Sequence, residues 1–217
     1  MKHTIYAVAL GIGLSLSLPG EAATRQYPVY PVQGEIALDG KMDDDAWQGA
    51  PRGTDFFPFL GAEDVQKTEF KILYDKANLY FGIRVSEADP GKQVLARQDN
   101  ESVWLDDSIE IFLQPGARKY YRVGVNAAGR RSDIAVSAAV GRGSDAWVLE
   151  VRVPFASLPE SPTTDKPMRG NICRNTLTRQ PVRHSSWAPV DRSFHESYNF
   201  AEFRLVPAPA SPDRIET

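Results

Sequence analysis

The chain has 217 residues, of which 42% are hydrophobic, with 16 glycines and 16 prolines, so it is long enough to bury one full core and leaves no room for a second catalytic domain. Its net charge of −3 comes from interspersed acidic and basic residues rather than from a basic stripe. We therefore expect no nucleic-acid partner and no attraction to an anionic membrane surface.

The first 22 residues have the order of a secretory signal peptide. Lys2 and His3 precede an apolar run from Ile5 to Leu18, and a proline, a glycine and the small residue Ala22 follow. The run is shorter than the about 20 residues that a spanning helix needs, although a retained membrane anchor is the alternative. The sequence predicts cleavage after residue 22 and a secreted or periplasmic protein with no membrane span after signal cleavage.

From residue 34 onward, short β-rich runs alternate with Gly, Pro, Asn and Asp. This pattern predicts one all-β domain over 23–206, an antiparallel β-sandwich of immunoglobulin-like or jelly-roll-like type with about ten strands. Residues 207–217 are predicted to form a Pro/Ala-rich extended tail. The clearest strands are expected at 69–74, 79–86, 108–113, 120–126, 134–138, 146–154, 170–178 and 201–206.

Alternation within the strands separates core residues from surface residues. Every second residue is apolar in 79–85 and again in 147–153, which places Trp147 in the core. The lone cysteine, Cys173, is expected to be a buried, inert thiol. The triple aspartate at 43–45 predicts an aspartate-capped helical turn that buries Trp47 near the edge of the sandwich, with calcium chelation as the alternative.

Two tryptophans, Trp104 and Trp187, stand among polar residues outside the alternating strands. An exposed indole is costly unless something flat and partly apolar covers it, and the C–H face of a sugar ring does so while its hydroxyls remain free for polar side chains. These tryptophans therefore indicate a carbohydrate-binding surface. Polar side chains that could bind hydroxyls are dense around the first of them: Arg97, Asp99, Asn100, Asp106, Asp107 and Glu110.

Charged residues within the strands could read a sugar as well. Glu110 alternates with apolar neighbours and so projects to the opposite face, either as a site residue or as an ordinary solvent-facing side chain. Arg122 and Arg174 also lie in strands, where each could hold a hydroxyl or pair with a surface carboxylate. His184 and His195 flank the second tryptophan and either contact a ligand or serve as surface or packing residues.

Catalytic motifs are scarce. No spacing singles out the pair of carboxylates that glycoside hydrolysis requires, there is no Gly-x-Ser-x-Gly, and the histidines lack zinc-ligand spacing. The sequence therefore predicts no catalytic residue. A hydrolase of O-glycosyl compounds is the enzyme alternative.

Five segments together resemble the family 9 carbohydrate-binding modules, which accompany xylanases. They occur in the family's order between Gly34 and Val206, at 38–47, 73–80, 104–113, 147–155 and 186–189. The resemblance implies a β-sandwich that grips the end of a glycan chain or an oligosaccharide between two tryptophans, in the service of polysaccharide breakdown. It also implies structural calcium in many members, no other cofactor, and a polysaccharide-degrading enzyme as a partner.

Motif matching carries the family's site onto this chain. Trp104 and Trp187 match the stacking walls, and Glu110 matches the hydroxyl-binding glutamate. Arg122 and Arg174 fall in the strands that carry the family's binding arginines. The resemblance therefore predicts that these five residues bind carbohydrate and that none is catalytic.

Two features depart from this picture. Gly124 stands where binding members tend to have a polar side chain. A related branch of the superfamily holds haem b through methionine, lysine or histidine, which makes a haem-binding redox subunit the third alternative. Met42 and Met168 are the only methionines beyond the predicted signal, and neither lies in a haem motif.

Overall fold

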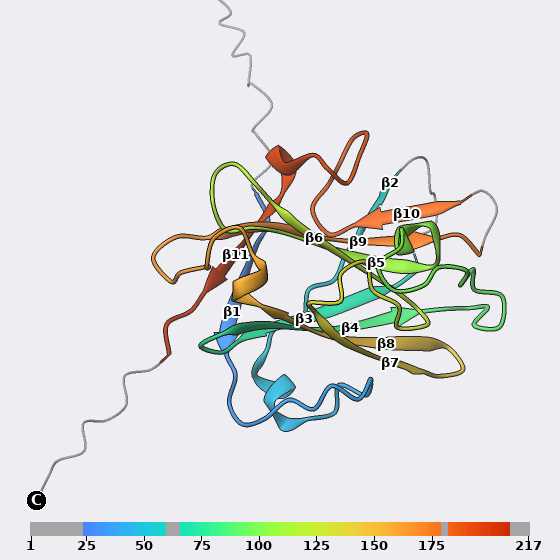
Figure 1. Ribbon diagram of the computed structural model, residues 1–217, viewed down its shortest axis with the longest axis horizontal. Coiled ribbons are helices and arrows are strands. Elements are labelled where there is room, and N and C mark those ends of the chain that lie inside the picture. The colour runs from blue at the N-terminus through green and yellow to red at the C-terminus, as the bar shows by residue number, and fades with distance from the viewer. Residues whose placement is uncertain (1–23, 60–65, 179–181, 209–217) are drawn as a thin grey trace, which may run out of the picture.

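The computed structural model describes residues 24–59, 66–178 and 182–208. These residues form eleven β-strands in two layers, with short 3-10 turns and no α-helix (Figure 1), which confirms the predicted all-β sandwich. No helix within these ranges is long and apolar enough to cross a membrane. The predicted signal segment and residues 209–217 of the tail lie outside the described residues, so both remain predictions.

One layer, which we call sheet B, is built on the two alternating runs of the sequence, β4 (Asn78–Ser86) and β8 (Ala146–Pro154). They pair antiparallel along their whole length. On the outer sides, β3 (Thr68–Tyr74) pairs with β4, and β7 (Ser137–Arg142) pairs with β8, again antiparallel. The strand order is therefore β3–β4–β8–β7.

The other layer, sheet A, contains β6 (Tyr121–Asn126), β5 (Ser108–Gln114) and β9 (Met168–Thr176), antiparallel and in that order. Two strands share the second edge of β9. Its C-terminal half pairs with β10 (Arg183–Ser186), and its N-terminal end pairs with β11 (Ala201–Leu205). The shared edge makes sheet A fork into two branches.

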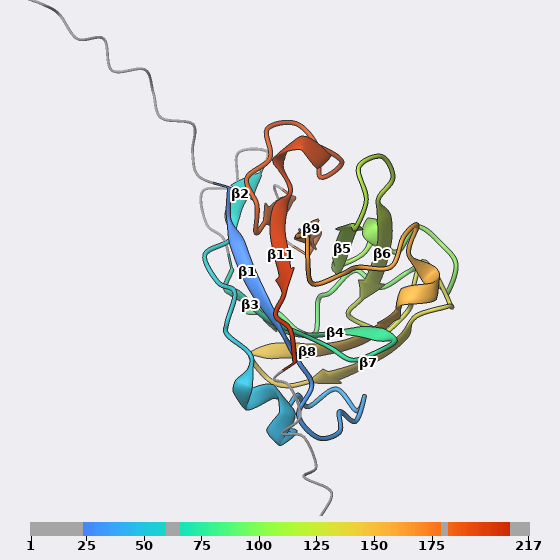
Figure 2. The ribbon, with the colours of Figure 1, turned by 90° about the vertical axis from the view of Figure 1, so that its left-hand side faces the viewer.

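Two strands near the N-terminus complete the layers. β2 (Phe57–Phe59) extends sheet A beyond β10. β1 (Gln26–Pro31) pairs first with β11 and then, through its last two residues, with β3, so it belongs to both sheets (Figure 2). Both pairings of β1 are parallel, and they are the only departures from the predicted antiparallel arrangement among the described strands.

The predicted strands differ from the observed ones where local chemistry overrides the pattern. The strand expected at 134–138 begins only at Ser137, because the Asp133 carboxylate accepts the Ala135 N–H and turns the chain before it. β1, β2 and β10 were not expected, since they are short and two of them contain proline. The remaining short elements are 3-10 turns: η1 (Asp45–Gly49), η2 (Val103–Leu105), η3 (Phe155–Ser157) and η4 (Ser197–Asn199).

The main core lies between the two sheets. Every second residue of β4 and β8 points into it, and Trp147 is only 2% exposed, as the alternation predicted. Cys173 is a buried free thiol, also as predicted. Sheet A contributes the facing side chains Ile109, Ile111, Leu113, Val123 and Val125.

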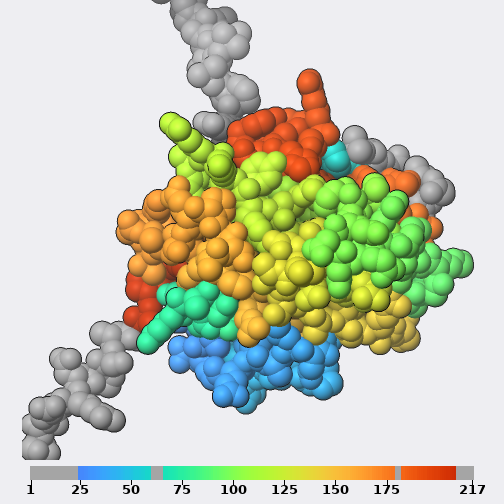
Figure 3. Space-filling model, viewed as in Figure 1, coloured from blue at the N-terminus to red at the C-terminus, as the bar shows by residue number. Residues whose placement is uncertain are grey.

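Residues 32–52 form a covering segment on the outer face of sheet B (Figure 3, blue). Its turn η1 buries Trp47, whose Nε1 donates to the carboxylate of Glu150 at 3.0 Å. The backbone N–H groups of Asp39 and Gly40 donate to the same carboxylate. Glu150 is fully buried and receives these three neutral donors, so it anchors the covering segment to β8.

The predicted cap of this turn is not formed as expected. Trp47 is buried, but it lies on the outer face of sheet B rather than at its edge. Asp44 stands at the N-terminal position without a side-chain capping bond, and its carboxylate accepts the N–H of Ala37 instead. Burial of the indole, rather than aspartate capping, therefore fixes this turn.

Candidate functional site

The outer face of sheet A gathers several of the predicted site residues. Glu110 pairs with Gly124 on β6 and with Cys173 on β9. Residues two positions apart share a face, so Arg122 and Asn175 lie beside Glu110. Asn175 Nδ2 donates to Glu110 Oε1 at 2.9 Å, and Arg122 Nη1 donates to Glu110 Oε2 at 3.3 Å.

Trp104 joins this group from the turn η2. Its indole is half-buried, and the Arg122 guanidinium carbon lies 3.7 Å from the centroid of the indole ring. This distance is that of a cation–π contact. Trp104, Glu110, Arg122, Asn175 and His195 together form what we call the Glu110 face.

Gly124 explains how the tryptophan reaches the sheet. A Cβ at this position would lie 2.9 Å from Val103 Cγ2 and 3.8 Å from Trp104 Cε3. Only a residue without a side chain therefore lets η2 pack directly on β6. The apparent departure from the family pattern is therefore a packing requirement of Val103, the residue of η2 that precedes Trp104.

The charge state of the Glu110 face follows from burial. Glu110 is only 4% exposed, and burial raises the pKa of its carboxyl, while hydrogen bonds from Asn175 and the charge of Arg122 act in the opposite direction. The same burial, reinforced by Glu110, raises the pKa of Cys173. The thiol therefore stays protonated, and the polar chemistry of this face rests on Glu110 and its donors.

His195 borders the Glu110 face from the loop before β11. Its Nε2 is 3.3 Å from Arg122 Nη1, and its Nδ1 is 2.7 Å from the hydroxyl oxygen of Tyr120. Burial and the charge of Arg122 lower the pKa of His195, which favours the neutral ring. Because a guanidinium can only donate, Nε2 accepts from Arg122, and we assign the ring proton to Nδ1, which donates to Tyr120.

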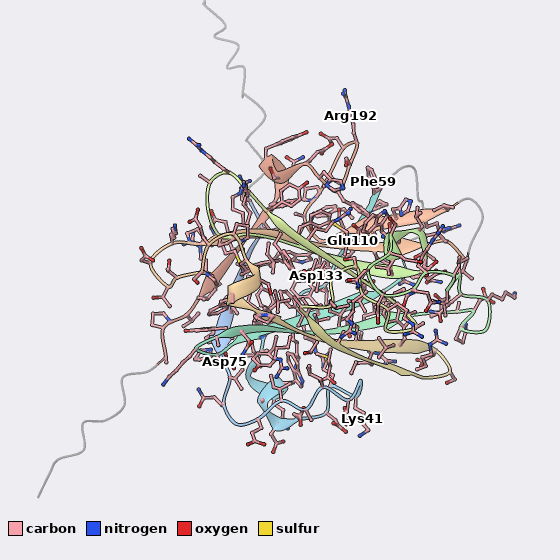
Figure 4. The ribbon with its side chains drawn as sticks, in the orientation of Figure 1. Lys41, Phe59, Asp75, Glu110, Asp133 and Arg192 are labelled. Carbon is pink, nitrogen blue, oxygen red and sulfur yellow. The ribbon has the colours of Figure 1, made fainter. Side chains whose placement is uncertain are left out.

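An apolar cluster bounds the Glu110 face on one side, and Figure 4 shows one of its members, Phe59, in the same layer as Glu110. The loop over it is held by the carboxylate of Glu196, which accepts three backbone N–H bonds from residues 191–193. These bonds lower the pKa of Glu196. The buried members of the cluster are Phe59, Phe112, Cys173, Phe194 and Phe200.

His184 lies on β10 between two members of that cluster. Its ring centroid is 5.8 Å from that of Phe194 and 6.2 Å from that of Phe59. Burial lowers the pKa of His184, and its buried Nδ1 has no hydrogen-bond partner among the described residues. The two histidines therefore lie on the Glu110 side of sheet A rather than around Trp187.

The structure contradicts the predicted role of Trp187 as a stacking wall. Trp187 is 5% exposed and belongs to the main core, where it stacks on Phe203 at 5.9 Å and meets Phe70 edge-on at 5.0 Å. Alternation is the reason. Ser186 pairs with Cys173, which faces outward, so the next residue points inward.

Arg174 also differs from its prediction. It pairs with Ile109, a core-facing residue, so its side chain points inward rather than towards the Glu110 face. It is 3% exposed, lies 3.5 Å from the carboxylate of Glu87, and donates to the Ser86 carbonyl at 2.8 Å. Arg174 therefore links sheet A to the end of β4, and it is not placed to read a sugar with Glu110.

The other polar residues near Trp104 mostly shape the chain. Asp106 accepts the N–H groups of Ala96 and Arg97, and Asp107 accepts that of Val94. Both aspartates are buried and hold the loop before η2 in place. Because these carboxylates already accept backbone N–H groups, they are not free to bind sugar hydroxyls.

In the described ranges, no group of three or more His, Cys, Asp or Glu side chains could hold a metal ion. Calcium also takes backbone and amide carbonyl oxygens as ligands, so the calcium that the family resemblance implies stays a prediction. Met168 is 1% exposed in the core, and the Met42 side chain packs against Gly82. Both thioethers are thus used in packing.

Sequence reasoning missed Asn175 and Tyr120. The signal for Asn175 was present in the alternation of β9, because the register that places Cys173 opposite Glu110 also brings Asn175 to the same face. Tyr120 reaches the site through His195, which follows a loop and has no strand pattern. Only the folded chain brings that pair together.

Comparison with solved structures supports the fold. A family 9 carbohydrate binding module from Caldicellulosiruptor kristjanssonii, solved with glucose, superposes with a TM-score of 0.65 at 19% identity, covering 86% of this chain and 99% of that one. The same organism's module with cellotriose gives 0.63 at 19% identity, over 87% and 100%. A candidate carbohydrate-binding protein from Bacteroides uniformis gives 0.70 at 18% identity, over 85% and 100%.

Sequence comparison points to the same family. The chain is 24% identical to endo-1,4-beta-xylanase A of Thermotoga neapolitana in an alignment 203 residues long, which covers 85% of this chain but only 18% of the xylanase. The family model described as carbohydrate family 9 binding domain-like matches residues 38–208. This match covers most of the sandwich, and the chain belongs to the carbohydrate family 9 binding domain-like family.

Proposed function

We propose that this protein is a secreted or periplasmic module that binds an oligosaccharide or polysaccharide without catalysis, on the Glu110 face. One observation carries the proposal: an indole, a guanidinium, a carboxylate and an amide converge on one face of sheet A. The glucose and cellotriose held by the solved modules from Caldicellulosiruptor kristjanssonii support a glycan ligand. Service to a polysaccharide-degrading enzyme is the biological role that we propose with it.

The proposed site has one tryptophan wall, since Trp187 is buried. The C–H face of a sugar ring would lie on the Trp104 indole, and the ring hydroxyls would meet Glu110 as acceptor and Arg122 and Asn175 as donors. Arg122 now lies over the indole, so we expect its guanidinium to move when a sugar stacks there. The guanidinium can remain hydrogen-bonded to Glu110 during this movement, because it has five N–H donors.

Recognition fits this group better than hydrolysis does. The two oxygens of Glu110 are already engaged, one by Asn175 and one by Arg122. A carboxylate held in this way is positioned to accept hydroxyl protons in a fixed direction. We therefore assign it to orienting a ligand.

Titration calorimetry of the mature protein with glucose, cellotriose and xylotriose tests this function. We expect saturable binding to at least one of them, abolished in Trp104→Ala and weakened roughly 10-fold or more in Glu110→Gln, since a hydrogen bond to a charged group contributes about 1.5–3 kcal/mol. Glu69→Gln, on the outer face of sheet B, is the control and should bind normally. Binding that survives Trp104→Ala would rule out this face as the site.

Export can be tested separately. Mass spectrometry of the protein recovered from the periplasm or the medium should give a mature N-terminus at residue 23. A protein that retains residues 1–22 in the membrane fraction would contradict the proposed localisation.

A further inference from the structure

A groove lies on the outer face of sheet B, on the opposite side of the sandwich from Glu110. Figure 4 shows Lys41 there, below the sheet, with Glu110 in the upper layer. The groove has a volume of about 200 Å³ and runs between the covering segment and strands β3, β4 and β8. Its charged and apolar lining includes Lys41, Met42, Arg52, Lys71, Arg84 and Val148.

Two of the cations around this groove have acidic partners outside it. Lys41 pairs with Asp39, and Arg84 pairs with Asp145 at 3.2 Å. The one acidic residue of the lining, Glu69, is itself 2.7 Å from the ammonium of Lys67. These pairs leave the charge of the other two cations uncompensated.

Arg52 and Lys71 are those two cations. Neither has an acidic partner in the part of the chain that the structure describes, and the Lys71 ammonium donates to the neutral carbonyl of Trp47. Both line the same groove, and burial together with the charge of Arg52 lowers the pKa of Lys71. An anion between them would relieve the repulsion between these two charges.

The wall of the groove is built rigidly. Gly40, with φ of +80°, lies so close to β7 that a Cβ on it would be 2.2 Å from the Gly141 nitrogen. The Glu150 carboxylate holds the same segment by accepting the backbone N–H groups of Asp39 and Gly40. Met42 follows with φ of +58°, a conformation that is unfavourable for a side chain and that the surrounding contacts must maintain.

The remainder of the lining is apolar. Met42 lies against Gly82, where a Cβ would be 2.8 Å from the methionine sulfur, and Val148 is half-buried beside it. The groove thus offers an apolar floor next to two cations. Its volume is below the about 300–1,000 Å³ of pockets for drug-sized ligands, which suits one sugar ring rather than an oligosaccharide.

We propose that this groove binds an acidic sugar residue, a uronate, with its carboxylate between Arg52 and Lys71 and its ring C–H groups against Met42 and Val148. A guanidinium and an ammonium match a carboxylate, and the apolar floor matches the ring. A flat membrane surface fits less well, because Lys71 is recessed and half-buried. The site is separate from the Glu110 face and does not depend on the function proposed for it.

Calorimetric titration with D-glucuronate, glucose and acetate tests the groove. We expect saturable binding of glucuronate by the wild type, and at least 10-fold weaker binding in the double variant Arg52→Gln/Lys71→Gln. The control Lys92→Gln/Lys166→Gln changes the charge equally at two lysines outside the groove and should bind normally. Trp104→Ala should also bind glucuronate normally, which separates this site from the Glu110 face.

Three outcomes would overturn the proposal. They are equal glucuronate binding in wild type and groove variant, loss of glucuronate binding in Trp104→Ala, and acetate binding as tight as that of glucuronate. Arg52→Gln alone protects the test against misfolding, since no hydrogen bond of its side chain is lost within the described residues. It should weaken glucuronate binding in the same direction as the double variant, but less.

Discussion

The two outer faces of the sandwich share a local arrangement and use it differently. On sheet A, Glu110 lies opposite Gly124, and on sheet B, Glu150 lies opposite Gly82. In each case a 3-10 turn brings a tryptophan close to the pair. The same three residue types therefore occur on both faces, yet the tryptophan is 2% exposed on sheet B and half-buried on sheet A.

The two faces differ in where the hydrogen-bond donors to the glutamate come from. Glu150 accepts hydrogen bonds from Trp47 Nε1 and from two backbone N–H groups of the segment that covers it, and these bonds hold that segment over the carboxylate. Glu110 receives donors from its own sheet, Arg122 and Asn175, and leaves Trp104 half-buried. The carboxylate of Glu150 is thus satisfied by the chain that covers it, whereas the carboxylate of Glu110 is satisfied by its neighbours in the sheet.

Replacing the buried Trp47 should have the largest effect on the free energy of unfolding. We expect Trp47→Ala to lower the free energy of unfolding by about 3–5 kcal/mol, because it empties a buried site and removes a donor from Glu150. Trp104→Ala should cost about 1 kcal/mol or less, mainly through its contact with Arg122. Urea denaturation of both variants measures the difference, and equal losses would refute the contrast between the faces.

The two strand arginines give the next largest effect. Arg174→Met removes the partner of the buried Glu87 and should lower the free energy of unfolding by about 3 kcal/mol without changing saccharide binding. Arg122→Met should weaken saccharide binding and cost less stability. Denaturation and calorimetry on the same samples check both. A binding loss in a folded Arg174→Met protein would restore this arginine to the site.

The two glycines should separate the binding functions. Gly124→Ala and Gly82→Ala each insert a Cβ within 3 Å of a packed side chain and should cost about 1–3 kcal/mol. We expect only the first to weaken binding of neutral saccharide, because it pushes against Val103 and so displaces the turn η2 that carries Trp104. Only the second should weaken glucuronate binding, because it displaces Met42. Loss of both activities in either variant would indicate general damage to the fold.

The smallest effect concerns pH. Burial raises the pKa of Glu110 above the ordinary 4.5, so the folded state binds more protons than the unfolded state just above that pH. By linkage, this carboxyl makes wild-type stability decline as pH rises through that window. The stability of the wild type relative to Glu110→Gln should therefore fall between pH 4 and 7. Urea titrations at several pH values measure it, and a relative stability that rises instead would show that the ion pair with Arg122 dominates.

Most of the sandwich was predictable from alternation, because strands buried on one face show it in sequence. β4 and β8 follow the pattern closely, and their tryptophan lies in the core as expected. β1 was not predictable, since its two parallel partners are far away in the chain and its prolines interrupt the pattern. Pairing with distant segments leaves no local signal.

For the candidate site, the alternation of side chains along each strand was more informative than the position of a residue in a motif. Trp104, Glu110 and Arg122 lie together as predicted, although their role in binding stays a prediction. Trp187 was predicted from its polar neighbours and Arg174 from its position in a strand, but their register relative to the outward-facing Cys173 points both side chains inward. A tryptophan among polar residues in the sequence can still be buried, because its neighbours do not show which face of the sheet its side chain points to.

The position of β1 has a mechanical consequence. β1 lies close to the beginning of the chain and β11 close to its end, and they run parallel with Gln26 beside Glu202 and Val29 beside Leu205. Tension applied at the two ends would pull these strands in opposite directions along their length. All the hydrogen bonds between the two strands would then bear the load at once, rather than break one after another from one end. The pairing of β1 with β11 is therefore loaded in shear, the geometry in which many hydrogen bonds must break together.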